Sequence, residues 1–261
     1  MFGKKHFIPF AVLGDPTIED SIKIIKELIK NGASALELGF AFSDPIADGP
    51  IIQKANNRAL ANKITTEKAF GIIEKIRKES IIPISVMLSY NLVYKYGTEN
   101  FYKKCKELKI NAILCPDVPL EESEDLVKNS KKYKIAQVFL VSPTTTKERM
   151  KKLNKVCTGY VYLVSLLGTT GARTELNKKL PELIKLTKKE MKLPVYVGFG
   201  ISKPGHVKNV LALGADGAIC GSAFCKIIEE NLMDKKTMLE KMGKFCKEMS
   251  QAAKRQKRDK K

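Results

Sequence analysis

Short runs typical of β-strands alternate with segments of helical periodicity along nearly the whole chain. Eight strands are predicted, at residues 6–13, 34–38, 82–88, 112–115, 136–141, 160–164, 194–197 and 217–220. Strands that alternate with helices in this way are typical of parallel βαβ units. Eight such units in a chain of 261 residues predict an α/β fold with a single domain, the (β/α)8 TIM barrel.

An open, doubly wound sheet is the alternative arrangement of the same elements. Such sheets often bind a dinucleotide at a glycine-rich turn that follows their first strand. The corresponding turn here, Leu13-Gly14-Asp15-Pro16, has no G-x-G-x-x-G pattern. The dinucleotide-binding version of this alternative is therefore disfavoured.

The first helix is predicted from its apolar spacing and from its end signals. Isoleucines recur at intervals of four, three and four residues: Ile18, Ile22, Ile25 and Ile29. This spacing places them on one face of a helix. Thr17 and Asp20 are placed as an N-terminal capping pair, and Asn31-Gly32 is a typical helix end.

The predicted barrel occupies residues 1–253, and residues 254–261 form a basic C-terminal tail. Two connections are longer than usual, 39–57 after the second strand and 166–179 after the sixth. Long connections in a compact domain are often functional. Both follow strands, so we expect both on the face where TIM barrels place their active sites.

The chain carries a formal net charge of +19, from 47 Lys and Arg against 28 Asp and Glu. Such an excess is compatible with a nucleic acid, an anionic membrane or an acidic partner. The tail contributes six basic residues and one acidic residue, and the rest of the excess is dispersed over predicted helix surfaces. Dispersed lysines without base-stacking aromatic residues argue against nucleic-acid binding.

The apolar runs of the chain are short. None approaches the roughly 20 residues that a membrane-spanning helix needs. The first residues also lack the apolar stretch of a signal peptide. We therefore expect a cytoplasmic protein with no membrane association.

Six cysteines are scattered along the chain without a C-x-x-C pair: Cys105, Cys115, Cys157, Cys220, Cys225 and Cys246. Several lie in apolar runs, so buried reduced thiols are expected. Because only two histidines occur, a metal site built from histidine and cysteine is not expected. We interpret His6, at the start of the first strand, and His206, in a helix, as structural or surface residues.

Glu37 interrupts an apolar run near the end of the second predicted strand. Successive side chains of a strand point to opposite faces, so if Leu36 and Leu38 pack against helices, Glu37 projects into the barrel. Loss of water there raises the pKa of a carboxyl group toward the range useful for general acid–base catalysis. A structural glutamate paired with a lysine is the alternative.

A second candidate carboxylate lies in the following loop, where Asp44 and Asp48 each precede turn-forming residues. Aspartates in such turns usually bond to backbone amides, so turn formation is their ordinary explanation. Asp48 lies 11 residues after Glu37, close enough for a folded loop to bring both carboxylates to one ligand. Two acids in different environments can then take different catalytic roles.

Glycines cluster after the last three predicted strands. They occur in Gly168-Thr169-Thr170-Gly171, Gly198-Phe199-Gly200 and Gly221-Ser222. Glycine lets an anion approach backbone N–H groups, and a helix N-terminus adds a favourable dipole. Single glycines at strand ends are usually only turns, but the corner after strands 7 and 8 is the usual phosphate site of TIM barrels. The pattern therefore predicts phosphate binding.

Three aromatic residues lie near predicted strand ends: Phe10, Tyr162 and Phe199. Their rings would suit a flat, apolar ligand group. Ordinary core packing is the alternative for each of them.

Several motifs resemble, in the same order, those of the α subunit of tryptophan synthase. They are Leu13-Gly14-Asp15-Pro16, Leu36-Glu37-Leu38-Gly39, Phe42-Ser43-Asp44-Pro45, Ala47-Asp48-Gly49-Pro50, Asp117-Val118-Pro119, Gly198-Phe199-Gly200-Ile201-Ser202 and Gly221-Ser222-Ala223. The resemblance covers nearly the whole chain. It implies cleavage of indole-3-glycerol phosphate to indole and glyceraldehyde 3-phosphate.

The resemblance also implies a role for each candidate residue. Glu37 would protonate indole C3 and assist the retro-aldol step, while Asp48 would accept the indole N–H. The indole pocket would be lined by Phe10, Tyr162 and Phe199. The phosphate would be held by Gly171, Gly200, Gly221 and Ser222. Thr170 would lie on a loop that closes over the substrate and meets Asp48.

Partners and cofactors follow from the same resemblance. No cofactor is expected in this subunit. Indole would pass to a β subunit that contains pyridoxal phosphate, in an α2β2 heterotetramer.

Three positions depart from the family pattern. Ala41 stands where proline is common, Leu166 where arginine is common, and Gly168-Thr169-Thr170-Gly171 where Gly-Val-Thr-Gly is common. These changes fall in loops rather than on the candidate catalytic residues. Because the sequence starts just before the first strand, we also expect that a preceding helix found in relatives is absent.

Two other functions remain open from the sequence. The first is a weakly active subunit that mainly activates its β partner, and the presence of both Glu37 and Asp48 favours an active lyase over it. The second is another phosphate-binding barrel of tryptophan or histidine biosynthesis. Glu37 together with the stretch 43–50 disfavours that alternative.

Overall fold

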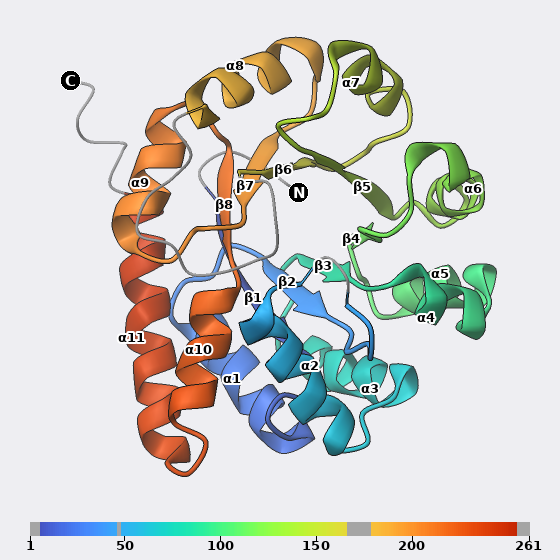
Figure 1. Cartoon of the computed structure of the whole chain (residues 1–261). Coiled ribbons are helices and arrows are strands. Elements are labelled where there is room, and N and C mark those ends of the chain that lie inside the picture. The colour runs from blue at the N-terminus through green and yellow to red at the C-terminus, as the bar shows by residue number, and fades with distance from the viewer. Residues whose placement is uncertain (1–5, 46–47, 166–178, 255–261) are drawn as a thin grey trace.

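Eight parallel strands close into a barrel in the computed structural model, which describes residues 6–45, 48–165 and 179–254 (Figure 1). The strands are β1 (His6–Val12), β2 (Leu36–Gly39), β3 (Ile84–Met87), β4 (Ala112–Leu114), β5 (Ala136–Val141), β6 (Val161–Val164), β7 (Val195–Gly198) and β8 (Gly217–Cys220). They follow chain order around the barrel, and β1 closes it by pairing with both β2 and β8. The predicted (β/α)8 barrel is confirmed, and the open-sheet alternative is wrong.

Helices surround the barrel (Figure 1). The described ones are α1 (Ile18–Lys30), α2 (Pro50–Ala61), α3 (Thr66–Arg77), α4 (Tyr90–Tyr96), α5 (Thr98–Glu107), α6 (Glu124–Tyr133), α7 (Lys147–Leu153), α8 (Leu180–Glu190), α9 (Pro204–Ala212), α10 (Ser222–Glu230) and α11 (Lys235–Lys254), with a 3₁₀ turn at Leu120–Glu122. Helix α1 begins where predicted, because the Thr17 hydroxyl accepts a hydrogen bond from the Asp20 N–H at 3.1 Å. The helix ends at Lys30 with Asn31 as its C-cap, which agrees with the end predicted at Asn31-Gly32.

The first of the two long connections is shorter than expected. The sequence predicts irregular structure over 39–57, but α2 already begins at Pro50. Proline fits the first turn of a helix, where a backbone N–H would have no intrahelical acceptor. In the second connection, 166–179, only Lys179 is described, and it forms the N-cap of α8.

Two apolar clusters lie on opposite faces of the strands. The inner cluster contains Ile8, Ala35, Ala112, Leu114, Val138, Tyr160, Tyr162, Tyr196 and Ile219. The larger cluster fills the space between strands and helices and includes Leu36 and Leu38. The alternation predicted for β2 is therefore confirmed, because the leucines pack outward and Glu37 faces the barrel interior.

The cysteines and histidines occupy buried or half-buried positions in the described structure. All six cysteines are buried and free, as expected. His206 is buried in α9, and His6 is half-buried in β1, where its ring stacks on Tyr196 at 5.9 Å between ring centroids. Within the described ranges, no helix is both long and apolar enough to cross a membrane, and no group of three or more metal-ligating side chains occurs.

Candidate active site

A cleft lies at the carboxyl-terminal ends of the strands. It is lined by Phe10, Glu37, Asp48, Ile52, Met87, Tyr162, Phe199, Gly200, Ile201, Ile219, Gly221 and Ser222. Eight of the ten site residues expected from the sequence are among them. The other two, Thr170 and Gly171, lie outside the described residues. One site thus combines two carboxyl groups, an apolar wall and a glycine-rich end.

Glu37 is placed in this cleft by the strand β2, which pairs with β1 and β3 on either side. Its side chain is only 1% exposed, and Oε1 accepts a hydrogen bond from the Tyr160 hydroxyl at 3.4 Å. The Tyr160 hydroxyl also lies 2.9 Å from the Ser85 hydroxyl. Burial raises the pKa of Glu37 to about 8, the Tyr160 bond opposes the rise, and the charge of Asp48 adds to it. Glu37 is therefore protonated near neutral pH.

Asp48 lies just before α2 and is less deeply buried than Glu37. Its Oδ2 accepts a hydrogen bond from the Asn56 amide at 3.2 Å. Burial raises the pKa of Asp48 to about 6, and the bond from Asn56 opposes that rise because it favours the carboxylate. Asp48 is therefore ionised at neutral pH while Glu37 holds its proton, which is the division of roles that paired acids need.

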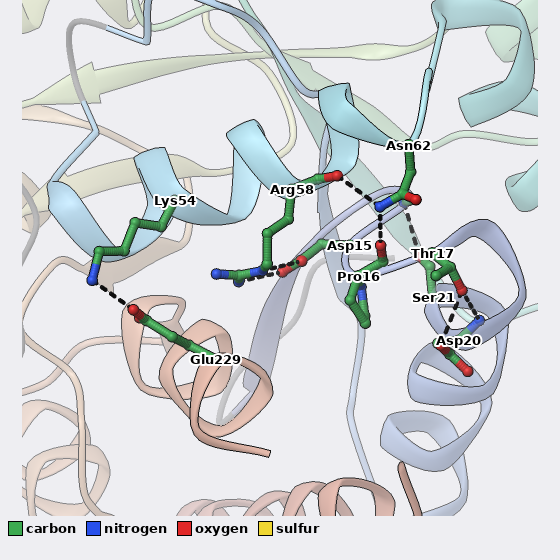
Figure 2. Close-up of polar contacts among 10 residues, drawn as sticks. Asp15, Pro16, Thr17, Asp20, Ser21, Lys54, Arg58, Asn62 and Glu229 are labelled. Carbon is green, nitrogen blue, oxygen red and sulfur yellow. Dashed lines mark hydrogen bonds and ion pairs between the residues drawn. The ribbon is translucent and has the colours of Figure 1, made fainter. Parts of the chain in front are cut away.

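Helix α2, which presents Asn56, is fixed by polar contacts along its length (Figure 2). Arg58 forms a bidentate ion pair with the buried Asp15 carboxylate, at 2.7 and 2.9 Å. The Asn62 amide donates to the Pro16 carbonyl at 2.6 Å, and Lys54 pairs with Glu229 of α10 at 2.6 Å. These contacts tie α2 to the turn after β1 and to α10. Bidentate pairs of this kind restrict orientation as well as distance, so they hold Asn56 in place against Asp48.

Sequence reasoning missed Asn56, although a signal for it exists. The buried face of α2 consists of Ile52, Ala55, Asn56 and Ala59. Asparagine is the one polar residue in that set, and a buried side-chain amide needs hydrogen-bond partners. A polar residue on the apolar stripe of the helix after Asp48 therefore indicates a contact with the site.

Aromatic side chains form the walls of the cleft beside the carboxyl groups. Tyr162 and Phe199 meet edge to face, with ring centroids 5.9 Å apart and planes at 82°. Gly198 makes room for this arrangement, since a Cβ atom there would lie 2.1 Å from the Tyr162 hydroxyl oxygen. Phe10 lines the cleft as predicted, and Ile52 and Met87 add apolar wall that the sequence reasoning did not identify.

Backbone groups form the other end of the cleft. Helix α10 begins at Ser222, directly after Gly221, and its N-terminus lies at the cleft. Gly200 and Ile201 from the turn after β7 face the same space. A helix N-terminus with adjacent N–H groups attracts anions through its dipole and through direct hydrogen bonds. This end of the cleft suits a phosphate group.

Comparisons with known proteins identify the family of this barrel. A family model described as tryptophan synthase alpha chain matches residues 2–254. The chain belongs to the tryptophan synthase alpha chain family. The alpha chain of Methanothermobacter thermautotrophicus is 47% identical over 240 residues, which cover 92% of this chain and 89% of that protein. That of Buchnera aphidicola is 45% identical over 247 residues, covering 94% and 92%.

Solved structures of the tryptophan synthase family share the fold of this chain. A chain of the a2b2 complex of Pyrococcus furiosus, from a study of mutual activation, matches with a TM-score of 0.89 and 38% identity. A second tryptophan synthase complex from Pyrococcus furiosus matches with a TM-score of 0.88 and 36% identity. Each match covers 95% of this chain and 99% of the other chain. The resemblance inferred from the sequence motifs is confirmed over the whole barrel.

Proposed function

We propose that this chain is the α subunit of tryptophan synthase and cleaves indole-3-glycerol phosphate to indole and glyceraldehyde 3-phosphate. The observation that carries the proposal is a pair of carboxyl groups, Glu37 and Asp48, in one cleft with an apolar wall and a glycine-rich end. Burial raises the pKa of Glu37 to about 8 and that of Asp48 to about 6, and both line one cleft. The apolar wall suits the indole ring, and the glycine-rich end suits the phosphate.

The first step is proton transfer from the Glu37 carboxyl group to C3 of the indole ring. The ring nitrogen then carries positive charge, and its N–H donates to the Asp48 carboxylate, which stabilises that charge. In the second step the Glu37 carboxylate removes the proton of the hydroxyl group on the carbon attached to C3. The C–O bond becomes a carbonyl, the carbon–carbon bond breaks, and its electron pair returns to the ring. Glu37 regains its proton, so the cycle closes without a further reactant.

The remaining site residues bind the substrate in this scheme. Phe10, Tyr162 and Phe199 hold the indole ring. Gly200, Gly221 and Ser222 hold the phosphate. Thr170 and Gly171, which the family resemblance also assigns to substrate binding, lie outside the described residues. Binding of the remote phosphate helps to orient the reacting carbon beside Glu37.

The reaction as written uses no cofactor in this chain. Pyridoxal phosphate is expected only in a partner β subunit, which would consume the indole. The Pyrococcus furiosus relative is described as part of an a2b2 complex with mutual activation. We infer the same α2β2 assembly for this chain, in the cytoplasm, with no nucleic-acid partner.

A weakly active subunit that mainly activates the β subunit is the second candidate, and the paired carboxyl groups disfavour it. Incubation of the purified chain with indole-3-glycerol phosphate, alone and with a β subunit, distinguishes the two candidates. We expect indole from the chain alone and more indole from the complex. A complete lack of indole under both conditions would overturn the lyase proposal. Glu37→Gln should lose most of this activity, and Glu74→Gln, at an exposed glutamate of α3 outside the cleft, is its matched control.

A further inference from the structure

The turn after β7 has two consecutive residues in the left-handed region of backbone conformation. Phe199 has a φ of 64° and Gly200 a φ of 81°. Glycine adopts this conformation freely, whereas a residue with a Cβ atom pays about 1 kcal/mol or more. Such a backbone persists only where its surroundings hold it, and it is frequent at functional sites. The contacts that hold this turn therefore bear on its function.

Two buried side chains hold the carbonyl groups of this turn. The hydroxyl of Ser165, directly after β6, donates to the Phe199 carbonyl oxygen. Nδ1 of His206, in the first turn of α9, lies 3.0 Å from the Gly200 carbonyl oxygen. The Ser202 N–H lies 3.3 Å from the same nitrogen. With its proton on Nδ1, His206 donates to the Gly200 carbonyl and holds it. With Nδ1 unprotonated, the ring accepts from the Ser202 N–H instead, so the positioning role belongs to the tautomer with the proton on Nδ1.

Holding a carbonyl group also aims the N–H group of the same peptide unit. In a trans peptide the C=O and N–H bonds point in opposite directions. The bond from Ser165 therefore aims the Gly200 N–H, and the contact with His206 aims the Ile201 N–H. Neither N–H has a hydrogen-bond acceptor within the described parts of the chain, and both residues line the cleft with Ser222.

We propose that Ser165 and His206 are positioning residues that orient the Gly200 and Ile201 N–H groups toward the substrate phosphate. This inference deepens the proposed function and rests on it. Neither side chain touches the substrate, because each acts through a backbone carbonyl. The phosphate binds between this turn and the N-terminus of α10, where charge-assisted hydrogen bonds from the aimed N–H groups add to the helix dipole.

The test for Ser165 is phosphate binding by the full-length Ser165→Ala protein. Inorganic phosphate and glycerol 3-phosphate are titrated by calorimetry, and both dissociation constants are expected to rise about tenfold, because an unheld peptide no longer presents its N–H to the anion. Ser250→Ala is the matched control. Like Ser165, Ser250 donates its hydroxyl to a backbone carbonyl, that of Gly32 at 2.6 Å, but Ser250 does not line the cleft. This control should bind both probes like the wild type.

The test for His206 separates substrate binding from chemistry. His206→Ala is expected to raise the KM for indole-3-glycerol phosphate about tenfold and to change kcat less than twofold, because the affected contact is remote from the reacting carbon. His206→Gln should restore the KM, since one amide group offers both a donor and an acceptor. Loss of kcat without a change in KM, or failure of glutamine to restore the KM, would overturn the role of His206.

Two further outcomes separate this inference from the proposed function. If the wild-type chain binds neither phosphate probe, the proposal that this end of the cleft binds phosphate is wrong. If it binds both and the Ser165 and His206 alanine variants bind them equally well, only the positioning role is wrong. A parallel loss of indole affinity in those variants would also overturn it, because the whole cleft would then be disturbed. Should Ser165→Ala fail to fold, Ser165→Cys replaces it, since a thiol keeps the volume but is a weak donor.

Discussion

The two ends of the cleft are built from different parts of the polypeptide. At the end proposed to hold the indole ring, called the indole end below, Glu37 and Asp48 present carboxyl groups beside aromatic walls, and burial raises the pKa of both. At the end proposed to hold the phosphate, called the phosphate end below, Gly200 and Gly221 present backbone groups whose direction depends on the surrounding turns. The chemistry is thus open to direct change by substitution, whereas phosphate binding changes mainly through residues that shape the backbone.

Removing the acid at the indole end should have the largest effect. Glu37→Gln keeps the size of the side chain but cannot deliver a proton to indole C3. We expect kcat to fall about a thousandfold, within the usual range for loss of a general acid–base group, with little change in phosphate affinity. Steady-state indole formation and calorimetric phosphate titration measure the two quantities. A variant with near-normal turnover would contradict the role given to Glu37.

The same substitution should stabilise the fold in a pH-dependent way. Glu37 has a pKa of about 8 in the native protein against 4.5 in an unfolded chain. Between these values the unfolded chain loses its proton first, so wild-type stability falls as the pH rises. Glutamine does not titrate, so Glu37→Gln escapes this fall in stability. The unfolding free energy of the variant should equal that of the wild type at pH 4, apart from any pH-independent difference, and exceed it by as much as about 4 kcal/mol at pH 8. Urea unfolding across this range measures it, and a constant difference would contradict the assigned pKa.

A substitution at Gly198 should displace the Tyr162 ring, which lines the cleft between its two ends. A Cβ atom there would lie 2.1 Å from the Tyr162 hydroxyl oxygen and 2.3 Å from its ring carbon Cζ. Gly198→Ala is therefore expected to cost about 1–3 kcal/mol of unfolding free energy and to displace the ring that lines the indole pocket. Thermal unfolding and the KM for substrate measure the effect.

The matched control for this clash is Gly71→Ala. A Cβ atom at Gly71, in α3, would meet no atom within 4 Å. That variant should be as stable as the wild type or slightly more stable, since alanine favours a helix. Replacement of Tyr162 by a smaller residue in the Gly198→Ala background should recover part of the lost stability. No recovery would show that the clash is not the cause.

The difference between the two ends also explains how far the sequence could predict this site. The barrel follows from strand and helix periodicity, and Glu37 stands out because a charge interrupts a buried strand. Ser165 and His206 act through backbone carbonyls, and no local pattern predicts which carbonyl a distant side chain reaches. Likewise, the sequence cannot place the start of α2 at Pro50 from turn residues alone, since Asp-Gly-Pro is equally typical of a loop. Contacts between distant segments were visible only in the folded barrel.

The smallest effect is expected for Asn56, whose side chain shifts the pKa of Asp48 but does not react. Wild-type kcat should follow a bell-shaped pH profile with limbs near pH 6 and pH 8, because Asp48 must be ionised and Glu37 protonated. The two limbs describe the coupled pair rather than either group alone. A change that acts directly on Asp48 should therefore move the acid limb most and the basic limb less, through the charge that Glu37 senses.

Asn56→Ala tests whether the acid limb of the pH profile depends on the pKa of Asp48. The Asn56 amide favours the Asp48 carboxylate, so its loss raises the pKa of Asp48 and moves the acid limb to higher pH. We expect kcat at pH 6 to fall about threefold while kcat at pH 7.5 changes little. Asn62→Ala is the control, because Asn62 forms the C-cap of the same helix but bonds to the Pro16 and Arg58 carbonyls instead. An equal loss of kcat at both pH values would mean that Asn56 supports the helix rather than the charge on Asp48.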